Sequence, residues 1–461
     1  MNTATSNLKI GPRNLGDVIS QQLQLFLEQK NYEAAKTLLL PVAPVDIAEA
    51  ITQLPKSLQL LAFRLLNKPV AIEVYEYFNS PLQQLLLTEF QEEEAGEIIN
   101  NIAPDERVKL FDELPPIIVK QLIKKLSPKE RKVTSLLLGY SPETAGRIMT
   151  PEYMELSENL TVEEAQAKIR ELAQDSEVFY YGYITDQFGR LLGIVSLKDL
   201  ILATPEQPLN EIMKQDIIYA YTDTDQEEAA NLMQRYNLLA LPILDRGETL
   251  LGVVTIDDII DIIETETTED VYKMAAVESE GNDYFEISLL NVIKKRIPWL
   301  LILLVTNSVT VLIMSRYEAV LDAVVALAFF TPLLIDTGGN IGAQSSTVVI
   351  RGFSTHELKN KKPPLVVWRE LMTGGMLGIV LGILAIVLVF ILLGTAEIGI
   401  TVGISLLVIS IMAAATGAAL PFVFKALGFD PALISGPFIT TIVDIVGILI
   451  YLNTAKLLLP I

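Results

Sequence analysis

One acidic residue lies in the middle of an otherwise apolar segment close to the end of the chain. Residues 432–459 contain no charged side chain apart from Asp444 and Lys456. A carboxylate at the depth of a bilayer costs about 3 kcal/mol or more unless water, a cation or a partner group receives it. Asp444 therefore indicates a path for cations, and the alternative is an acid that is hydrogen-bonded inside a helix bundle.

Polar residues also recur along one face of two predicted helices. Asp336 and Asn340 are four residues apart in one apolar segment, and Gly436, Thr440 and Asp444 follow the same spacing in another. Residues four apart share a face of a continuous helix. Two polar faces of this kind suit a hydrated pore. Close packing of helices through small residues is the alternative, and it explains the glycines but not the aspartates.

A further group of acids occupies residues 257–270. Asp258, Asp261 and Glu269 would lie near one face of a continuous helix. Close carboxylates repel one another, and a divalent cation between them removes this repulsion. The stretch is therefore a candidate sensor of divalent cations, and an ordinary solvated acidic surface is the alternative.

Residues 146–265 contain two related halves. Residues 191–201 match residues 250–260, and each half is predicted to end as strand, turn, strand and helix. A hydroxyl residue precedes each helix, with an aspartate three positions later: Ser196 with Asp199, and Thr255 with Asp258. This arrangement resembles a tandem CBS pair. Many such pairs bind adenosine nucleotides such as ATP at this position, and a plain helix cap is the alternative.

Long apolar segments in the last part of the chain predict five membrane spans. They are Ile297–Met314, Val320–Ile350, Leu371–Leu393, Ile398–Leu420 and Ile434–Leu459. The second contains Asp322, Asp336 and a glycine pair, so we expect it to be broken or tilted. Lysine and arginine gather before the first span, between the second and third, and between the fourth and fifth. Since these residues mark the cytoplasmic side, we expect a cytoplasmic N-terminus and a C-terminus outside.

The charge and composition of the chain limit its partners. The formal net charge is −21, and the excess of acids is concentrated in residues 148–290. This acidic block would repel nucleic acid and attract cations. The chain has no cysteine and one histidine, and it lacks both a His-Glu-x-x-His motif and a phosphate-binding loop. We therefore expect no disulfide framework, no thiolate metal site and no enzyme.

Residues 15–145 predict a stack of short amphipathic helices. Related four-residue stretches recur at spacings of 23 or 24 residues, and prolines separate them. This period favours a wound helical stack over a set of unrelated helices. The first residues of the chain are polar and lack an apolar core, so we expect no secretory signal.

The order of these parts resembles the MgtE family of magnesium channels over essentially the full chain. The most specific segments are Gly338–Ser346 and Asp430–Pro437, followed by Thr440, Thr441, Asp444 and Gly447. The resemblance implies an α-helical N-terminal superhelical domain, an α/β tandem CBS pair, a long linker or plug helix and a transmembrane domain of five α-helices. The implied ranges are 1–145 for the helical domain, 146–207 and 208–265 for the CBS domains, 266–295 for the plug helix and 296–461 for the pore domain.

The resemblance also implies which residues contact Mg²⁺. The ion-selecting aspartate of the family falls on Asp444, and the candidate pore ligands are Asp444, Thr440, Gly436, Asn340 and Asp336. The candidate regulatory ligands are Asp225, Glu227, Asp258, Asp261, Glu266, Glu269 and Asp270. Some members of the family carry asparagine at the position of Gly436 and an acid at that of Asn237. We therefore expect local differences in the pore and in one regulatory site.

Together these features imply a Mg²⁺-selective channel for magnesium uptake, with several spans in the inner or plasma membrane of the cell. By the resemblance it is a homodimer in lipid, with the pore on the two-fold axis. Cytosolic Mg²⁺ would close it by bridging the acidic surfaces of the CBS pair and the plug helix. The alternative is a CBS-regulated secondary carrier for another divalent cation. The residues do not discriminate between Mg²⁺, Mn²⁺, Co²⁺ and Ca²⁺.

Overall fold

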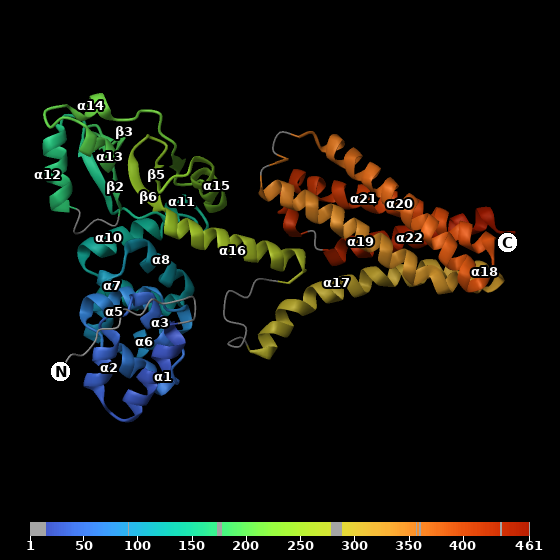
Figure 1. Cartoon of the computed structure of the whole chain (residues 1–461), viewed down its shortest axis with the longest axis horizontal. Coiled ribbons are helices and arrows are strands. Elements are labelled where there is room, and N and C mark those ends of the chain that lie inside the picture. The colour runs from blue at the N-terminus through green and yellow to red at the C-terminus, as the bar shows by residue number, and fades with distance from the viewer. Residues whose placement is uncertain are drawn as a thin grey trace, which may run out of the picture. The chain divides into compact units, whose positions relative to one another are not determined.

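The computed structural model describes most of the chain (Figure 1). The described residues are 15–90, 92–172, 178–277, 288–355, 357–358, 361–433 and 436–460. The chain divides into two compact units, Met1–Ile263 and Glu264–Ile461. Each unit has a hydrophobic core of its own.

The first unit begins with a stack of short helices. They are α1 (Leu15–Glu28), α2 (Tyr32–Leu39), α3 (Pro44–Thr52), α4 (Lys56–Phe63), α5 (Lys68–Glu76), α6 (Ser80–Glu89), α7 (Glu92–Asn101), α8 (Pro104–Glu113), α9 (Pro116–Lys125) and α10 (Pro128–Leu137). Proline stands in the first turn of α3, α5, α6, α8, α9 and α10, where its missing N–H costs no hydrogen bond. These starts keep the helices short, and the predicted stack is confirmed.

Two related halves follow, and each contains a three-stranded sheet. The first comprises α11 (Ala145–Ile148), β1 (Tyr153–Ser157), α12 (Val162–Leu172), β2 (Val178–Thr185), β3 (Leu191–Ser196) and α13 (Leu197–Leu202). The second comprises α14 (Leu209–Ile212), β4 (Ala220–Tyr221), α15 (Gln226–Tyr236), β5 (Ala240–Leu244), β6 (Leu250–Thr255) and the start of α16 (Ile256–Met274). In both sheets the first strand pair is parallel and the second antiparallel. The internal repeat and the fold of a CBS pair are therefore confirmed.

Helix α8 joins the helical stack to the second half of this repeat. Val108 on α8 is buried in one core with Ile259 and Ile262 of α16. One turn further along α8, Asp112 forms an ion pair with Arg147 of α11. Apolar burial and a charged contact thus fix the same helix.

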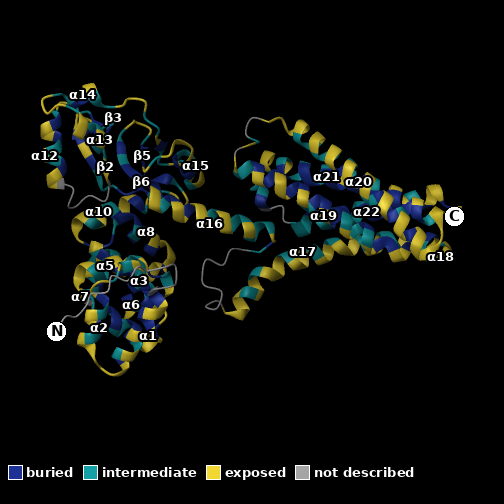
Figure 2. Ribbon diagram, in the orientation of Figure 1, coloured by how far each residue is buried: buried dark blue, intermediate teal, exposed yellow. Residues whose placement is uncertain are grey.

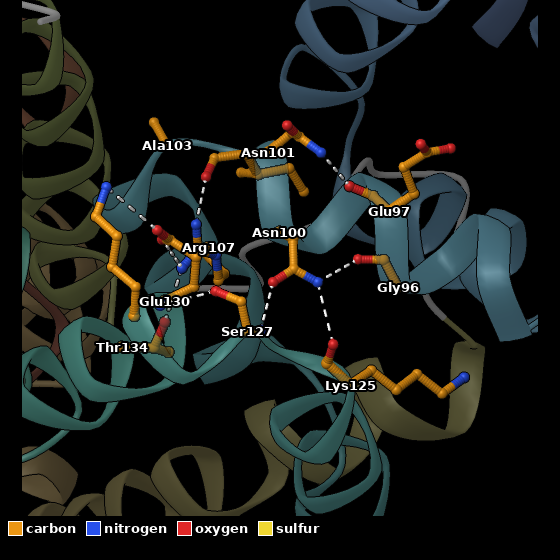
Figure 3. Close-up of polar contacts among 12 residues, drawn as sticks. Gly96, Glu97, Asn100, Asn101, Ala103, Arg107, Lys125, Ser127, Glu130 and Thr134 are labelled. Atoms are coloured by element: carbon orange, nitrogen blue, oxygen red, sulfur yellow. Dashed lines mark hydrogen bonds and ion pairs between the residues drawn. The ribbon is translucent and has the colours of Figure 1, made fainter. Parts of the chain in front are cut away.

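Arg107 fastens α8 to α10 from within the stack (Figure 3). Its side chain is 1% exposed and donates to Glu130 Oε2 at 2.8 Å, to Thr134 Oγ1 at 2.9 Å and to the carbonyl of Ile102 at 2.7 Å. A buried charge of this kind is stable only when it is paired and hydrogen-bonded. Beside it, Asn100 on α7 hydrogen-bonds the backbone at the end of α9 and ahead of α10.

The second unit is a bundle of long helices. The last part of α16 is followed by α17 (Leu289–Arg316), α18 (Glu318–Ala323), α19 (Ala326–Ser354), α20 (Pro363–Leu393), α21 (Ala396–Ala426), the 3-10 helix η1 (Pro431–Leu433) and α22 (Gly436–Leu458). Within the described residues, α17, α20, α21 and α22 are long and apolar enough to cross a membrane. With 29 residues α19 is also long enough, although its polar side chains lower its hydropathy. The predicted break in the second span occurs at Val324 and Val325.

The helices of this bundle differ in burial (Figure 2). α17 contains no buried residue, whereas α21 is buried over more than half of its most apolar stretch. A Cβ on Gly417 of α21 would lie only 2.2 Å from the carbonyl oxygen of Gly342 on α19, so the two backbones touch. α21 therefore lies at the centre of the packing, and α17 offers an apolar surface suited to lipid.

The segment predicted as the plug helix, residues 266–295, contains the last part of α16 and the first residues of α17. α16 begins at Ile256, directly after β6, and ends at Met274. Ala276 then adopts a left-handed backbone conformation with φ of 58°, which cannot continue the helix. Residues 278–287 lie outside the described residues, as do 434 and 435 in the specific segment ahead of α22.

Candidate cation path and regulatory sites

Helices α19 and α22 approach each other through glycines. A Cβ on Gly339 would lie 3.1 Å from Cγ2 of Thr440, and one on Gly342 would lie 3.0 Å from Cγ2 of Ile439. A side chain at either glycine would crowd these methyl groups, which would have to shift by a few tenths of an ångström. The glycines therefore hold the polar residues of the two helices near each other.

Two carboxylates meet at this contact, one from each helix. Asp336 on α19 is exposed and accepts a hydrogen bond from Asn340 Nδ2 at 3.3 Å. Asp444 on α22 is half-buried, and it follows Val443, whose Cγ1 would lie 3.1 Å from a Cβ on Gly338, two residues after Asp336. Thr440, four residues before Asp444, donates its hydroxyl to the carbonyl of Pro437 at 2.9 Å. Four of the predicted pore residues thus lie along one helix contact.

Gly436, the remaining predicted pore residue, is the first residue of α22. A Cβ at Gly436 would have the carbonyl oxygen of Met274 as its nearest neighbour, at 3.9 Å. The end of α16 therefore lies beside the start of α22. Among the described residues, no three His, Cys, Asp or Glu side chains are grouped so that they could hold a metal ion. The charged groups at the pore contact are the two carboxylates, with amide and hydroxyl groups beside them.

The acids at the start of α16 are engaged by groups of the first unit. Asp258 accepts a hydrogen bond from the hydroxyl of Thr255. Asp261 accepts one from Lys109 Nζ at 3.3 Å, and Glu106 lies 3.5 Å from the same ammonium. Burial lowers the pKa of Lys109, but the charges of Glu106 and Asp261 outweigh this effect and raise the pKa above its usual value. Lys109 therefore supplies the positive charge beside Asp261, at a place where the sequence predicts a divalent cation.

The acids at the end of α16 are engaged within the second unit. Lys273 Nζ lies 2.8 Å from Glu269 Oε1 and 2.8 Å from Asp430 Oδ2. Asp270 accepts a hydrogen bond from Ser354 Oγ at 3.2 Å. Burial raises the pKa of Asp270, the hydrogen bond from Ser354 opposes the rise, and the charge of Asp430 adds to it. These contacts connect α16 to the end of α19 and to the segment before α22.

The other predicted regulatory residues lie on α15 and in the middle of α16. Asp225 caps α15, because its Oδ1 accepts a hydrogen bond from the N–H of Glu227 at 2.8 Å. Glu266 is half-buried on α16. Asn237 ends α15 with a left-handed φ of 52°, which asparagine adopts more readily than most residues. Because the acids of α16 alone extend over about 18 Å of helix, the seven predicted ligands do not form one site.

The two candidate nucleotide positions lie at the starts of helices α13 and α16, and the first of them is a helix cap. Ser196 donates to Asp199 at 2.6 Å and accepts from its N–H at 3.1 Å, which forms a capping box at α13. The hydrogen bond from the Ser196 hydroxyl holds the pKa of Asp199 below its usual value, and Lys214 at 3.8 Å adds to this. In the second half, Thr255 donates to Asp258 in the same way. Both aspartates therefore already accept a hydrogen bond from the hydroxyl residue that precedes the helix.

Sequence reasoning missed the two lysines, Lys109 and Lys273, that pair with the regulatory acids. One signal was present for Lys273, which is the only lysine or arginine between Arg246 and Lys294. A single base in such an acidic stretch predicts an ion pair, although not its partner. No comparable signal marks Lys109.

A bundle of long apolar helices with two carboxylates at one helix contact, joined to a CBS pair, defines a membrane transporter for cations. Comparison with known proteins agrees with this class. A family model described as a divalent cation transporter matches residues 331–454. The model of the MgtE intracellular N domain matches residues 42–143, and that of the CBS domain matches 145–206 and 209–265.

Individual proteins are similar over most of the chain. The magnesium transporter MgtE of Thermus thermophilus is 37% identical over 96% of this chain and 98% of its own. The magnesium transporter MgtE of Bacillus subtilis is 32% identical over 89% of this chain and 91% of its own. A crystal structure of the cytosolic domain of the Mg²⁺ channel MgtE in complex with ATP is 33% identical and covers 53% of this chain and 99% of that one, with a TM-score of 0.51. The chain therefore belongs to the MgtE family of magnesium transporters.

Membership of this family establishes the class of activity. The chain belongs to a family of membrane transporters whose curated members are named magnesium transporters, and this is not a family of enzymes. The relatives with enzyme names match between 16% and 27% of this chain, through its CBS domains. The predicted multi-domain fold is confirmed, with a helical N-terminal part, a CBS pair and a helical membrane part.

Proposed function

We propose that this protein is a Mg²⁺-selective channel for magnesium uptake that cytosolic Mg²⁺ closes. The observation that carries the proposal is the proximity of Asp444 on α22 to Asp336 on α19, at a contact that glycines make close. Two carboxylates on membrane helices are costly unless water or a cation receives them. The family supports Mg²⁺ as the ion, and the helix contact supports these residues as its ligands.

The proposed pore holds Mg²⁺ with most of its water. Mg²⁺ dehydrates reluctantly and usually keeps several waters when it binds a protein. Asp444 and Asp336 would therefore attract the hydrated ion, and Asn340 and Thr440 would hydrogen-bond its waters. In a homodimer with the pore on the two-fold axis, each of these groups would be present twice.

The proposed gate responds to repulsion between carboxylates. The regulatory ligands are Asp225, Glu227, Asp258, Asp261, Glu266, Glu269 and Asp270. At low Mg²⁺ these acids repel one another, and at high Mg²⁺ bound ions bridge them and hold α16 against the pore helices. The bias of lysine and arginine between the spans supports a cytoplasmic N-terminus, a C-terminus outside and CBS domains that sense cytosolic Mg²⁺.

We also propose that the CBS pair binds an adenosine nucleotide such as ATP. The relative of known structure that contains ATP supports this proposal, because it covers the same part of the chain. The candidate residues are Ser196 and Asp199 in the first half and Thr255 and Asp258 in the second. Calorimetric titration of the purified protein with ATP tests the site, and Asp199→Ala should weaken any binding that depends on the first cap.

Mg²⁺ current through the purified protein in a planar bilayer tests the channel. Asp444→Asn should abolish the current, because it removes the charge that attracts the ion. Asp322→Asn is a matched control, because Asp322 is an exposed acid on α18 that is not among the proposed ligands. Normal current in Asp444→Asn would refute the pore assignment, and a flux that requires a coupling ion would favour a secondary carrier.

The same recording tests the gate. Loading the CBS side with Mg²⁺ should close the wild-type channel. Neutralising Asp258, Asp261 and Glu266 together should leave current at Mg²⁺ concentrations that close the wild type. Unchanged closure in this variant would reject these acids as the sensor while leaving the pore assignment intact.

A further inference from the structure

The acidic stretch that includes α16 contains a single basic residue. Lys273 is the only lysine or arginine between Arg246 and Lys294. Its side chain is 26% exposed, and its ammonium lies 2.8 Å from a carboxylate oxygen of Glu269 and 2.8 Å from one of Asp430. Burial lowers the pKa of Lys273, but these two hydrogen bonds outweigh that effect and raise the pKa above its usual value. The ammonium therefore stays charged at physiological pH.

Asp430 is held through both of its oxygens. Oδ2 accepts the hydrogen bond from Lys273, and Oδ1 accepts one from the N–H of Ala432 at 2.8 Å. Ala432 belongs to η1, which comes directly before α22. A displacement of Lys273 would therefore act on the backbone just ahead of the helix that carries Asp444.

Two further contacts bring the end of α16 to the proposed pore helices. Asp270 accepts a hydrogen bond from Ser354, the last residue of α19. The carbonyl oxygen of Met274 lies beside Gly436, the first residue of α22. The last turns of α16 thus contact the ends of both helices that meet at the proposed ion site.

We propose that Lys273 and Asp430 form a metal-free latch that holds the end of α16 against the pore helices. The ammonium neutralises Glu269 and Asp430, which would otherwise repel each other, and so replaces a bridging divalent cation at this point. The latch rests on the proposed gating role of α16. With this latch, Glu269 belongs to an ion pair and not to a Mg²⁺ site. Mg²⁺ then acts on the acids nearer the start of α16.

Two substitutions remove the latch without large changes of shape. Lys273→Gln should raise the Mg²⁺ concentration that halves the bilayer current by about fivefold, the size expected for one partly exposed ion pair. Asp430→Asn should have the same effect, because it removes the negative charge that faces Lys273. The side-chain oxygen of asparagine still accepts the hydrogen bond from the N–H of Ala432. Lys294→Gln, at an exposed lysine on α17, should leave this concentration unchanged. An unchanged midpoint in both latch variants would overturn the proposal.

Hydrogen exchange of residues 264–274 tests the latch without any current. In the full-length protein in detergent without Mg²⁺, Lys273→Gln should speed this exchange about fivefold. Equal exchange in Lys273→Gln and the wild type would refute the latch. If the wild type carries no Mg²⁺ current, the channel proposal fails, and the exchange rates still decide whether the latch exists.

Discussion

Replacing Arg107 by methionine should weaken the contact between α8 and α10 by about 3–5 kcal/mol, the cost of removing one partner of a buried ion pair. Arg107 is 1% exposed, and the carboxylate of Glu130 beside it is 14% exposed. The substitution leaves that carboxylate with only the exposed ammonium of Lys129, 3.8 Å from its Oε1. It also removes the donors to the hydroxyl of Thr134 and the carbonyl of Ile102.

The surface pair between Arg64 and Glu94 provides the matched control. Its atoms are 3.2 Å apart, and each side chain is 45% exposed. An exposed pair of this kind contributes about 0–1 kcal/mol, because water screens both charges. Arg64→Met should therefore leave local stability almost unchanged, although it removes the same chemical group.

A double variant separates the loss of the pair from the burial of a lone charge. Arg107→Met combined with Glu130→Gln removes both charges, so neither is left uncompensated. The combined cost should be smaller than the sum of the two single costs. Additive costs would show that the two side chains contribute independently and would contradict a coupled, buried ion pair.

Hydrogen exchange in the full-length protein measures these costs, at the α8 and α10 amides for Arg107→Met and at the α4 and α7 amides for Arg64→Met. A loss of 3 kcal/mol or more speeds exchange through local opening by about two orders of magnitude or more. Arg107→Met should reach this range and Arg64→Met should not. Equal protection in both variants would refute the reasoning. Because α8 also carries Lys109, the same variant should loosen the contact with Asp261.

Two other predictions concern packing and pH. Gly417→Ala should lower the unfolding temperature in detergent, because its Cβ would meet the Gly342 carbonyl oxygen at 2.2 Å and overpacking costs about 1–3 kcal/mol. Gly375→Ala is its control, since a Cβ there has 3.8 Å of room, and equal losses would contradict the packing argument. Burial raises the pKa of Glu76 from 4.5 to about 7, so the folded state loses stability as the pH rises through this range. Glu76→Gln should therefore raise the unfolding temperature at pH 8 but not at pH 4, and a rise at neither pH would refute the assignment.

Much of the fold follows from local signals in the sequence. Prolines recur through the first part of the chain, and they predicted short helices because a proline acts within one helical turn. The matching segments 191–201 and 250–260 fold as β3 with α13 and as β6 with α16. A repeat is informative because the same local pattern has to fold twice.

The membrane part was predictable to a lesser degree. Four helices could be recognised by length and hydropathy, but α19 carries polar residues on one face. The four-residue spacing of Asp336 and Asn340 predicted that they share this face, and their hydrogen bond confirms it. Which helix packs against that face could not be predicted, since it depends on glycines such as Gly339 meeting Thr440 across the bundle.

The counter-ions of the regulatory acids lay beyond sequence reasoning. Lys109 is separated from Asp261 by 152 residues, and Lys273 from Asp430 by 157. Periodicity and composition report on neighbours along one helix, so they reveal the acids but not distant partners. The acidic run therefore suggested bare carboxylates, whereas the folded chain supplies a lysine to two of them, Asp261 and Glu269.

In the proposed mechanism, Mg²⁺ is the only one of the counter-ions at α16 whose concentration varies. Lys109 and Lys273 are attached to the chain, so their effective concentrations at Asp261 and Glu269 are constant. These ion pairs therefore determine how much repulsion is left for Mg²⁺ to remove. A chain with neutral residues at both positions would need more Mg²⁺ to close. The two lysines thus determine the Mg²⁺ concentration at which the channel closes, whereas the remaining acids bind the Mg²⁺.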